Sequence, residues 1–370
     1  MHIVHLIDAV SDSGVTRVVL TLARAMTTAG HRVTVLTCRD GIDSAAASGL
    51  HLLRLPGLRE PPRWQRRLLG ARFAALVNAK SDSAVLDAWA GREHPDFVFI
   101  HGLSALRFHR LGYRHAIVAH STKSKMLLPA AAVPWRPLWR SLYARVYRNR
   151  DIVAVSSGAR DDLLREFGAD PARVFCIHNP CDIERIAELA EAPVDDLPER
   201  PFFVAAGRAV RAKRFDLLVR AFARCDVNAD LLILGQGRKF RRYARLARQL
   251  GVGGRVHFPG YRHNPYPYFR QARALVLSSD YEGFGNTLVE SLACGTAVVS
   301  TDCPSGPREI LGDRFREYLV PCGSVDDLAD GMRRVFLAPY DYPRELLEGF
   351  SPSRVTEKYL EFIKDVVARD

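Results

Sequence analysis

The strongest constraint on this chain is a pattern that occurs twice along its length. Short apolar runs alternate with segments whose apolar residues recur at helical spacing, first from residue 2 and again from residue 202. This alternation is typical of βαβ units, in which parallel strands form a sheet covered by helices. Two domains of ordinary size account for the 370 residues. The sequence therefore predicts an α/β protein with two Rossmann-like, doubly wound domains facing an interdomain cleft.

The apolar runs predict where the strands of each domain lie. Strands of the first domain are expected at His2–Ile7, Arg32–Cys38, Phe97–His101, Ala116–His120 and Ile152–Ser156. Strands of the second are expected at Phe202–Ala206, Leu231–Leu234, Val256–Phe258, Ala274–Ser278 and Ala297–Thr301. A domain boundary is expected near Asn179-Pro180 or in the stretch 192–201, which is rich in Pro, Asp and Glu. We therefore predict domains over 1–180 and 181–350.

Composition excludes several classes of protein. A hydrophobic content of 48% excludes intrinsic disorder. The sequence has no apolar run of about 18 residues, so it predicts no transmembrane helix. The first eight residues lack a basic region and include Asp8, so they predict a strand and not a signal peptide. The seven cysteines are scattered without a C-x-x-C pair, which argues against a zinc site or a disulfide framework. We therefore expect a cytoplasmic protein.

The net charge of +12 is concentrated in the first half of the chain. Residues 1–175 hold 25 Lys and Arg against 14 Asp and Glu, whereas residues 176–370 hold 28 against 27. Ten basic residues and no acidic residue lie between Asp96 and Asp151. A basic half predicts an anionic partner, such as a membrane surface, a nucleic acid or a phosphorylated substrate.

The densest functional signal lies between Tyr281 and Gly295. Gly283 and Gly285 follow a predicted strand and allow the backbone to approach a ligand closely. A helix is expected to begin at about Asn286, so its free N–H groups and its dipole form an anion site. Glu282 and Glu290 flank this site, and carboxylates there are suited to accept hydrogen bonds from sugar hydroxyl groups.

This pattern resembles a known family. The spacing Glu-x7-Glu around Gly-Phe-Gly, followed by Ala-Cys-Gly-Thr-Ala-Val-Val-Ser-Thr-Asp, strongly resembles the family 4 retaining glycosyltransferases of GT-B fold. Four further segments agree with it, and the likeness covers almost the whole chain, including a last helix at about 351–370 that typically crosses back to the first domain. These segments are Ser13-Gly14-Val15, Ala116–His120, Ala206-Gly207-Arg208 with Lys213, and Gly260-Tyr261-Arg262.

The resemblance implies transfer of a sugar from a nucleotide-diphosphate donor, with retention of the anomeric configuration. It implies that Arg208 and Lys213 clamp the diphosphate, that Glu282 binds the transferred sugar, and that His120 contacts that sugar from the opposite domain. These four are the expected catalytic residues. Residues expected to bind the donor are Gly14, Arg262, Phe284, Gly285, Asn286, Thr287, Leu288 and Glu290, the last by holding the ribose. Ser13 departs from the two glycines often found in this loop, so the role of Gly14 stays open.

The same resemblance bears on the donor and on metals. The donor is expected to be a UDP-hexose or a UDP-N-acetylhexosamine. No D-x-D triplet occurs in the sequence, so cations of the protein and a helix end are expected to hold the diphosphate. We therefore expect no essential metal and no cofactor besides the donor substrate.

Each of these residues also has a purely structural interpretation. Arg208 and Lys213 occur where a solvated helix start is possible, and Glu282 occurs where a strand can simply end. His120 and His101 each close an apolar strand, and His101 is interpreted as a structural strand-end residue. The turn Cys303–Glu309 is either a plain helix start or a segment near the donor, and the sequence favours neither.

The basic half is expected to meet the acceptor. The residues predicted for this acceptor or membrane surface are Arg63, Trp64, Arg66, Arg67, Lys123 and Lys125, because arginines beside aromatic side chains suit a headgroup boundary. A second aromatic stripe, from Trp135 to Tyr147, has helical spacing and is expected to pack on its own sheet.

The preferred acceptor is lipid-linked or a cell-surface glycan, with peripheral association at the inner face of the cytoplasmic membrane. The motifs also resemble those of lipopolysaccharide and capsule enzymes. A soluble acceptor such as a natural product or an aminocyclitol is an alternative, as is a sugar-nucleotide epimerase of the same fold. A basic nucleic-acid-binding protein is the alternative of another class, although no nucleic-acid motif occurs.

Overall fold

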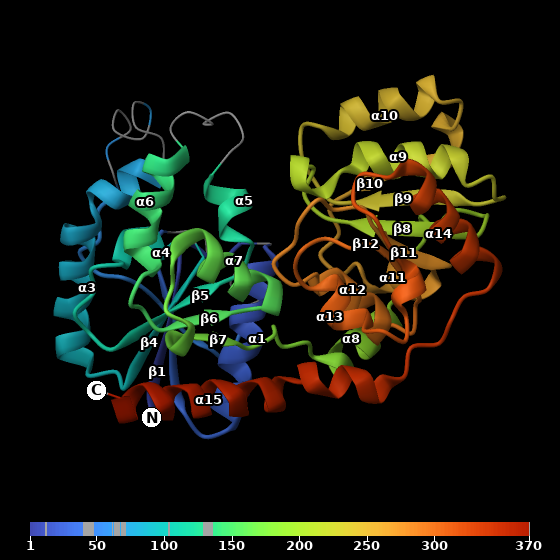
Figure 1. Ribbon diagram of the computed structural model, residues 1–370. Coiled ribbons are helices and arrows are strands. Elements are labelled where there is room, and N and C mark those ends of the chain that lie inside the picture. Colours follow the sequence, from blue (N-terminus) through green and yellow to red (C-terminus); the bar gives the residue numbers. More distant parts are fainter. Residues whose placement is uncertain are drawn as a thin grey trace. The chain divides into compact units, whose positions relative to one another are not determined.

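The structure, a computed structural model, describes residues 1–11, 13–39, 48–60, 62, 67, 72–102, 104–128 and 136–369. Its internal contacts divide the chain into two compact units, Met1–Pro180 with Pro352–Asp370, and Cys181–Ser351. Each unit is built around its own parallel sheet (Figure 1). The chain therefore leaves the first unit once and returns to it through its last helix.

The first unit contains a parallel sheet with the strand order β3-β2-β1-β4-β5-β6-β7. Its strands are β1 (His2–Ile7), β2 (Arg32–Thr37), β3 (His51–Arg54), β4 (Phe97–His101), β5 (His115–Ala119), β6 (Ile152–Ala154) and β7 (Val174–Cys176). Every residue of β1 and β4 is buried, as expected for parallel strands covered on both faces. Because β1, β4 and β5 are neighbours, the residues at their carboxyl ends gather where the strand order reverses.

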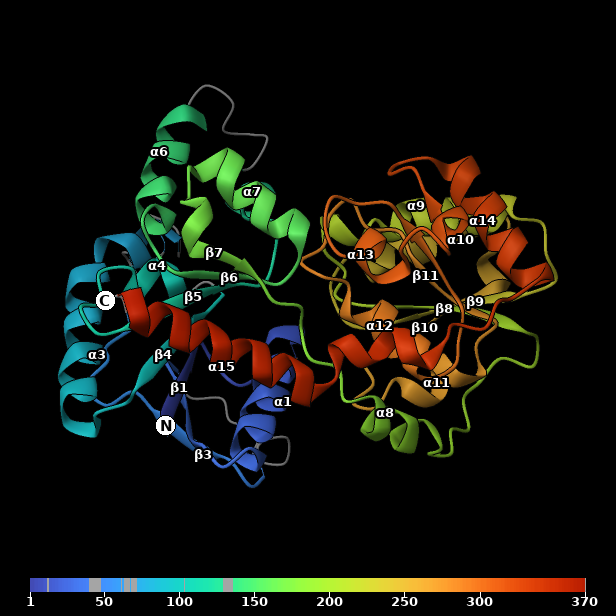
Figure 2. The same ribbon diagram turned by 60° about the horizontal axis from the view of Figure 1, so that its bottom comes forward.

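Helices cover both faces of this sheet. They are α1 (Gly14–Thr28), α3 (Ala79–Glu93), α4 (Ser104–Phe108), α5 (Lys123–Leu127), α6 (Arg136–Tyr147), α7 (Ser157–Phe167), the short η2 (Pro171–Arg173) and α15 (Pro352–Arg369). Figure 2 shows α15, the red helix, lying beside α1. Tyr359 and Phe362 of α15 pack edge-on against Phe99 and Phe97, with ring centroids 5.1 and 6.1 Å apart. Aromatic packing of this kind fixes the last helix to the first sheet.

The second unit repeats the architecture with the strand order β10-β9-β8-β11-β12-β13. Its strands are β8 (Phe202–Ala206), β9 (Asp230–Leu234), β10 (Val256–Gly260), β11 (Ala274–Leu277), β12 (Val298–Thr301) and β13 (Leu319–Val320). Its helices are α8 (Ile183–Ala190), α9 (Phe215–Arg224), α10 (Phe240–Gln249), α11 (Tyr266–Gln271), α12 (Asn286–Ala293), α13 (Pro307–Leu311) and α14 (Val325–Leu337). Short 3₁₀ helices complete it: η3 (Arg211–Lys213), η4 (Gly253–Arg255), η5 (Arg316–Tyr318) and η6 (Arg344–Phe350).

The ten strands expected from the sequence are all present, with ends that shift by at most two residues. The sequence missed β3, β7 and β13, which lie at sheet edges and have two to four residues each. Short edge strands carry too few apolar positions to produce a clear alternation. In the described part of the chain, no helix is both long and apolar enough to cross a membrane.

The aromatic stripe of α6 packs against the core of the first unit from Trp139 onward but not at Leu138. Tyr143, Val146 and Tyr147 are buried, and Tyr147 lies 5.3 Å from the ring of Phe167. Leu138, one turn earlier, is 63% exposed. The expectation of a packed stripe is therefore right for the last turns of α6 and wrong for Leu138, while Trp135 lies outside the described residues.

Candidate active site

The loop between β11 and α12 is shaped by glycines. Gly285 caps α12 with a φ of +96°, a conformation that L side chains rarely adopt. Gly306 approaches this loop so closely that a Cβ atom on it would lie 1.6 Å from the carbonyl oxygen of Phe284. The hydroxyl of Ser305 donates to the carbonyl of Glu282 over 2.7 Å. The turn 303–309 therefore supports the Gly-Phe-Gly loop, a contact that the sequence left open.

Lys213 and Glu282, predicted to bind different parts of the donor, are partners of each other. The Lys213 ammonium lies 2.7 Å from Oε1 of Glu282, and the two side chains are 20% and 12% exposed. The hydroxyl of Ser279 also donates to that oxygen, over 2.6 Å. Each charge of this partly buried pair compensates the other, so removal of one partner would leave an uncompensated charge. A bound diphosphate would therefore compete with Glu282 for the Lys213 ammonium.

Arg208, the second predicted cation, has a different environment. It is exposed at the end of β8, and no ion pair of its guanidinium is found among the described residues. Gly207 has a φ of +152°, and a Cβ atom on it would lie 3.1 Å from Cε of Lys213. A Cβ atom on Gly235, after β9, would lie 2.0 Å from the carbonyl oxygen of Gly207. This tight packing fixes the Gly207 backbone, directly before Arg208, against the Lys213 stem.

Gly235 and Gly237, which the sequence did not reveal as candidates, pack against the segment that holds Arg208. A Cβ atom on Gly237 would lie 2.7 Å from that of Ala209, so both glycines let the loop after β9 pack on the Arg208 segment. The Gly-Gln-Gly triplet directly after a predicted strand was the available signal. Such a triplet alone is a weak signal, although Arg238 and Lys239 follow it directly.

Further predicted donor residues lie in the loop before α12 and in the first turns of that helix. Phe284 and Leu288 are buried, so only their backbone can reach a ligand, and the ring of Phe284 lies 5.3 Å from that of Phe350. Asn286 is half-buried at the first position of the helix. The Thr287 hydroxyl is buried without a hydrogen-bond partner in the described part of the chain. A buried hydroxyl lacking a partner is costly unless a ligand supplies one. Glu290 is also buried, at 6% exposure.

The Arg262 side chain is engaged within the protein. Its guanidinium pairs with Asp196 and donates from Nε to the Tyr268 hydroxyl over 2.8 Å. Tyr268 in turn donates to Asp196 over 2.6 Å. The side chain therefore ties the loop after β10 to the segment before β8, which leaves the backbone of this loop as the part that can contact a base.

In the first unit, His120 is the end of a three-histidine network, defined as His5, His101 and His120. His101 Nδ1 lies 2.8 Å from His120 Nε2, and His101 Nε2 lies 2.9 Å from His5 Nδ1. His101 is therefore more than a structural strand-end residue, because it joins β1 to the end of β5. The sequence did not reveal this network, since it depends on the adjacency of β1, β4 and β5.

Burial keeps this network neutral. Burial lowers the pKa of His5 to about 3, and burial together with the neighbouring imidazoles lowers that of His101 well below its ordinary value. The pKa of His120 is lowered to about 3, first by burial and then by the Lys123 ammonium. Nδ1 of His120 is buried and has no partner among the residues that the structure describes.

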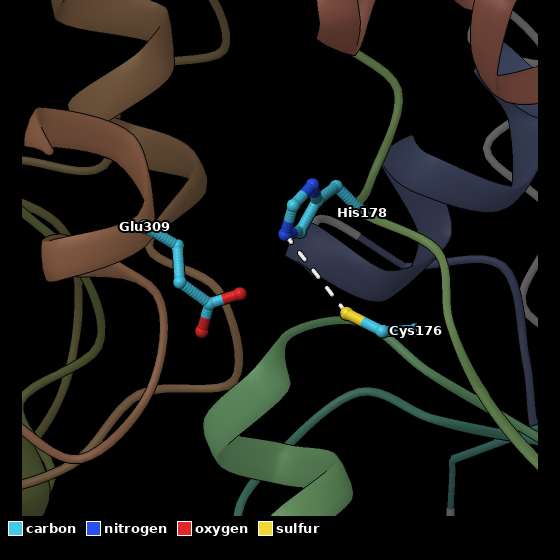
Figure 3. A group of neighbouring side chains, drawn as sticks. All are labelled: Cys176, His178 and Glu309. Atoms are coloured by element: carbon cyan, nitrogen blue, oxygen red, sulfur yellow. Dashed lines mark hydrogen bonds between the residues drawn. The ribbon is translucent and has the colours of Figure 1, made fainter.

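Two further segments of the first unit lie at the carboxyl ends of its strands. Ser13 caps α1, because its hydroxyl accepts from the Thr16 N–H over 3.2 Å, and Gly14 opens that helix. Cys176 ends β7 and His178 follows it, with Sγ and Nε2 4.0 Å apart (Figure 3). Glu309, also drawn there, belongs to the second unit, where its carboxylate accepts from the Gly306 N–H over 3.3 Å.

The predicted acceptor surface is only partly described. Arg63, Trp64 and Arg66 lie outside the described residues, whereas Arg67 and Lys125 are exposed. Lys123 is buried, at 1% exposure, so its assignment to a surface is wrong. Its aliphatic stem and ammonium lie inside the first unit, where the Asp162 carboxylate compensates the charge electrostatically. Asp162 is fixed there by the backbone N–H of Ser124, over 2.8 Å.

Comparison with known proteins decides the family. Residues 13–185 match the family model described as Glycosyltransferase Family 4, and residues 191–348 match the model described as Glycosyl transferases group 1. The chain belongs to the family 4 glycosyltransferases. The predicted resemblance to this family is therefore confirmed.

Curated members of this family resemble the chain over part of its length. It is 32% identical to the N-acetylgalactosamine-N,N'-diacetylbacillosaminyl-diphospho-undecaprenol 4-alpha-N-acetylgalactosaminyltransferase of Campylobacter jejuni, over 52% of each chain. It is 28% identical to the Lipopolysaccharide 1,6-galactosyltransferase of Salmonella typhimurium, over 53% of this chain and 55% of that one. The chain thus spans about half the length of the curated relatives it matches.

Solved structures extend the likeness to the whole fold. HepE from Anabaena, in complex with UDP and glucose, aligns with a TM-score of 0.73 over 99% of this chain and 100% of its own, at 15% identity. This likeness, with the two parallel sheets, shows the GT-B fold that the sequence predicted.

Proposed function

We propose that this family 4 glycosyltransferase moves a hexose or an N-acetylhexosamine from a UDP-sugar to a lipid-linked or cell-surface glycan acceptor, with retention of the anomeric configuration. The observation that carries the proposal is the cation cluster at the carboxyl ends of β8 and β11. There Arg208 is exposed, Lys213 is held 2.7 Å from Glu282, and α12 begins at a glycine cap. A leaving diphosphate needs this concentration of positive charge and oriented N–H groups.

The donor roles follow from the chemistry of each group. Arg208 forks onto two phosphate oxygens, and Lys213 adds a point charge once the diphosphate replaces Glu282 as its partner. Glu282, released from Lys213, then accepts hydrogen bonds from hydroxyl groups of the transferred sugar. Glu290, at the buried side of α12, holds the ribose. Because these cations neutralise the diphosphate, the reaction requires no metal.

The choice of UDP and of a glycan acceptor is supported by the relatives. HepE was solved with UDP, and the two curated relatives are named for transfer to diphospho-undecaprenol and to lipopolysaccharide. The excess of positive charge in residues 1–175 suits an acceptor that carries phosphate groups or lies in an anionic membrane.

The first experiment measures ligand binding. Nucleoside diphosphates and nucleotide sugars are screened for the rise they cause in the melting temperature, with wild type, Arg208→Ala and Arg220→Ala. Arg220 is an exposed arginine on α9 and serves as the matched control. UDP compounds should stabilise wild type and Arg220→Ala, and should fail to stabilise Arg208→Ala. Stabilisation of all three to the same extent would remove Arg208 from the site.

The second experiment tests the reaction and the metal. With a UDP-sugar and a phospholipid-linked glycan, the anomeric configuration of the product is read by NMR, and the rate is compared with and without EDTA. An inverted product or a loss of activity with EDTA would contradict the proposal. Sugar isomerisation without acceptor would instead indicate an epimerase.

Peripheral membrane association is part of the proposal and has its own test. The exposed side chains of Arg67, Lys125 and Leu138 combine positive charge with an apolar group, which suits a lipid headgroup boundary. Vesicles with and without phosphatidylglycerol are floated with the protein at physiological salt. Flotation should require the anionic lipid and should weaken in Arg67→Ala/Lys125→Ala. Absence of binding would favour a soluble acceptor, and tight binding to DNA that UDP leaves unchanged would favour the nucleic-acid alternative.

A further inference from the structure

The histidine network of the first unit ends at a thioether. Nε2 of His5 lies 3.4 Å from Sδ of Met26, which belongs to α1. Two nitrogen-to-nitrogen hydrogen bonds, of 2.9 and 2.8 Å, then lead through His101 to His120. His5 and Met26 are fully buried, and the ring of His5 stacks on Phe99 with centroids 5.4 Å apart. The order is thus Met26, His5, His101, His120, from the interior to the end of β5.

A count of protons leaves two arrangements for this network. A neutral imidazole has one N–H and one bare nitrogen, so three rings carry three protons. Each hydrogen bond between two rings needs one proton, which leaves the third at one end of the network. That proton lies either on Nε2 of His5, facing the sulfur, or on Nδ1 of His120.

The groups at both ends of the network favour the arrangement in which the third proton lies on Nε2 of His5. A thioether sulfur accepts hydrogen bonds weakly and donates none, so it pairs with an N–H of His5 and not with a bare nitrogen. At the other end, a proton on Nδ1 of His120 would make a buried donor that lacks an acceptor in the described part of the chain. The protons therefore lie on Nε2 in all three rings.

We propose that Met26, His5 and His101 are positioning residues that fix the proton of His120 on Nε2, so that its Nδ1 is bare and serves only as a hydrogen-bond acceptor. The inference rests on the proposed function for the contact between His120 and the donor sugar. A bare Nδ1 selects a hydroxyl group, which donates, and disfavours a group that only accepts. Charged groups do not disturb this assignment, because burial and the nearby Lys123 both oppose protonation of His120.

Histidine nitrogen NMR tests the proton positions without any ligand. Protonated and bare imidazole nitrogens have well-separated ¹⁵N shifts, and removal of one histidine at a time assigns the signals. Near pH 7, His5, His101 and His120 should each be neutral with the proton on Nε2. A protonated Nδ1 or a charged ring at His120 would overturn the inference, while leaving the UDP site of the second unit unaffected.

Met26→Leu removes the acceptor at nearly constant volume. The ratio of the Nδ1–H to the Nε2–H form of His120 should rise by about threefold to tenfold, the scale of one weak hydrogen bond. Met332→Leu is the matched control, because Met332 is equally buried but lies on α14 of the second unit. Unchanged proton positions in Met26→Leu would show that the sulfur does not set them.

Kinetics then connect the network to the donor. Met26→Leu should raise the KM for the donor sugar by the factor by which the fraction of His120 with a bare Nδ1 falls in the nitrogen NMR, with a smaller change in kcat. Among monodeoxy donors, the one that lacks the hydroxyl bound by His120 should lose this dependence on Met26. If the NMR result holds while every donor retains its KM, the contact of His120 with the sugar is refuted and the proton arrangement alone stands.

Discussion

The two units share a strand order and differ in the chemistry at the ends of their strands. In each, the first strand of the unit lies between the second and a later one, as β2-β1-β4 and β9-β8-β11. The first unit places two neutral imidazoles there, the buried His101 and the half-buried His120, whereas the second places Arg208, Lys213 and Glu282, all at least partly exposed. The fold thus sets where functional residues lie, and the environment sets which chemistry they perform.

Burial explains this difference. Imidazoles lose their charge when desolvated, and a neutral ring can still share hydrogen bonds, as His5, His101 and His120 do. Ammonium and guanidinium groups cannot give up their charge so readily, so they stay near water or take a partner such as Glu282. We therefore expect the second unit to contribute electrostatic stabilisation and the first to contribute orientation.

The largest effect on activity should come from the charged end, by which we mean the strand ends of the second unit that hold Arg208, Lys213 and Glu282. Arg208→Ala should lower kcat/KM by about 10²–10³-fold, because a preorganised cation that faces the leaving diphosphate is lost. The measurement is initial rate against donor concentration, with Arg220→Ala as the exposed control on α9. If Arg208→Ala retains most of its activity while its melting temperature is normal, the charged end does not perform the electrostatic role assigned to it.

The second prediction tests how the turn at Gly306 supports the loop before α12 in the second unit. Gly306→Ala should reduce the free energy of unfolding by about 2–4 kcal/mol, since a Cβ atom there would lie 1.6 Å from the carbonyl oxygen of Phe284. Gly323→Ala is the matched control, with a φ of +82° and no atom within 4 Å, and should cost about 1 kcal/mol. Urea denaturation measures both. Equal losses would mean that positive φ alone, and not the contact with the loop, explains the need for glycine.

The sequence predicted those parts of the fold and of the candidate site that depend on residues close together along the chain. The interior strands β1, β4 and β8 have the bounds expected from their apolar runs. The segment from Glu282 to Glu290 was also predictable, because a loop and the helix after it are local in sequence. Networks formed across strands, such as His5 with His101, depend on strand order, which periodicity does not specify.

Lys123 illustrates a second limit of sequence reasoning. A lysine in a basic loop ordinarily lies at the surface, and the sequence placed it there. Its burial follows from the packing of α5 against α7, which brings Asp162 within reach of its charge. A compensating carboxylate 39 positions away gives no local signal. Burial of a charged residue is thus visible only after the helices are placed.

The third prediction uses this buried lysine. Burial lowers the pKa of Lys123 to about 8, although Asp162 opposes the shift. Between about pH 8 and pH 10.5 the unfolded chain therefore holds a proton that the native state has lost, so this residue makes stability rise with pH. The rise should be about 2 kcal/mol between pH 7.5 and pH 10. It should disappear in Lys123→Met.

Comparison of lysine variants isolates the contribution of Lys123 to the pH dependence of stability. Buried thiols such as Cys38, whose pKa burial raises to about 12, act with the opposite sign over the same range. Urea denaturation is therefore compared among wild type, Lys123→Met and Lys125→Met, an exposed lysine on the same helix. Lys125→Met should follow wild type. A Lys123→Met curve parallel to wild type would mean that the ammonium is solvated, as the surface assignment required.

The smallest effect should come from the strand ends of the first unit, where the neutral His101 and His120 lie. His120→Phe keeps an aromatic ring and removes the Nδ1 acceptor, so kcat/KM should fall by about fivefold to twentyfold, the scale of one or two neutral hydrogen bonds. Since the pKa of His120 is lowered to about 3, wild-type kcat/KM should show no step between pH 6 and pH 8 that His120→Phe abolishes. The pH profiles of both proteins, measured with the same donor, test this. A loss as large as that of Arg208→Ala, together with such a step, would make His120 an acid or base in the reaction. The contrast between an orienting first unit and a charged second unit would then fail, because both strand ends would act on the reacting atoms.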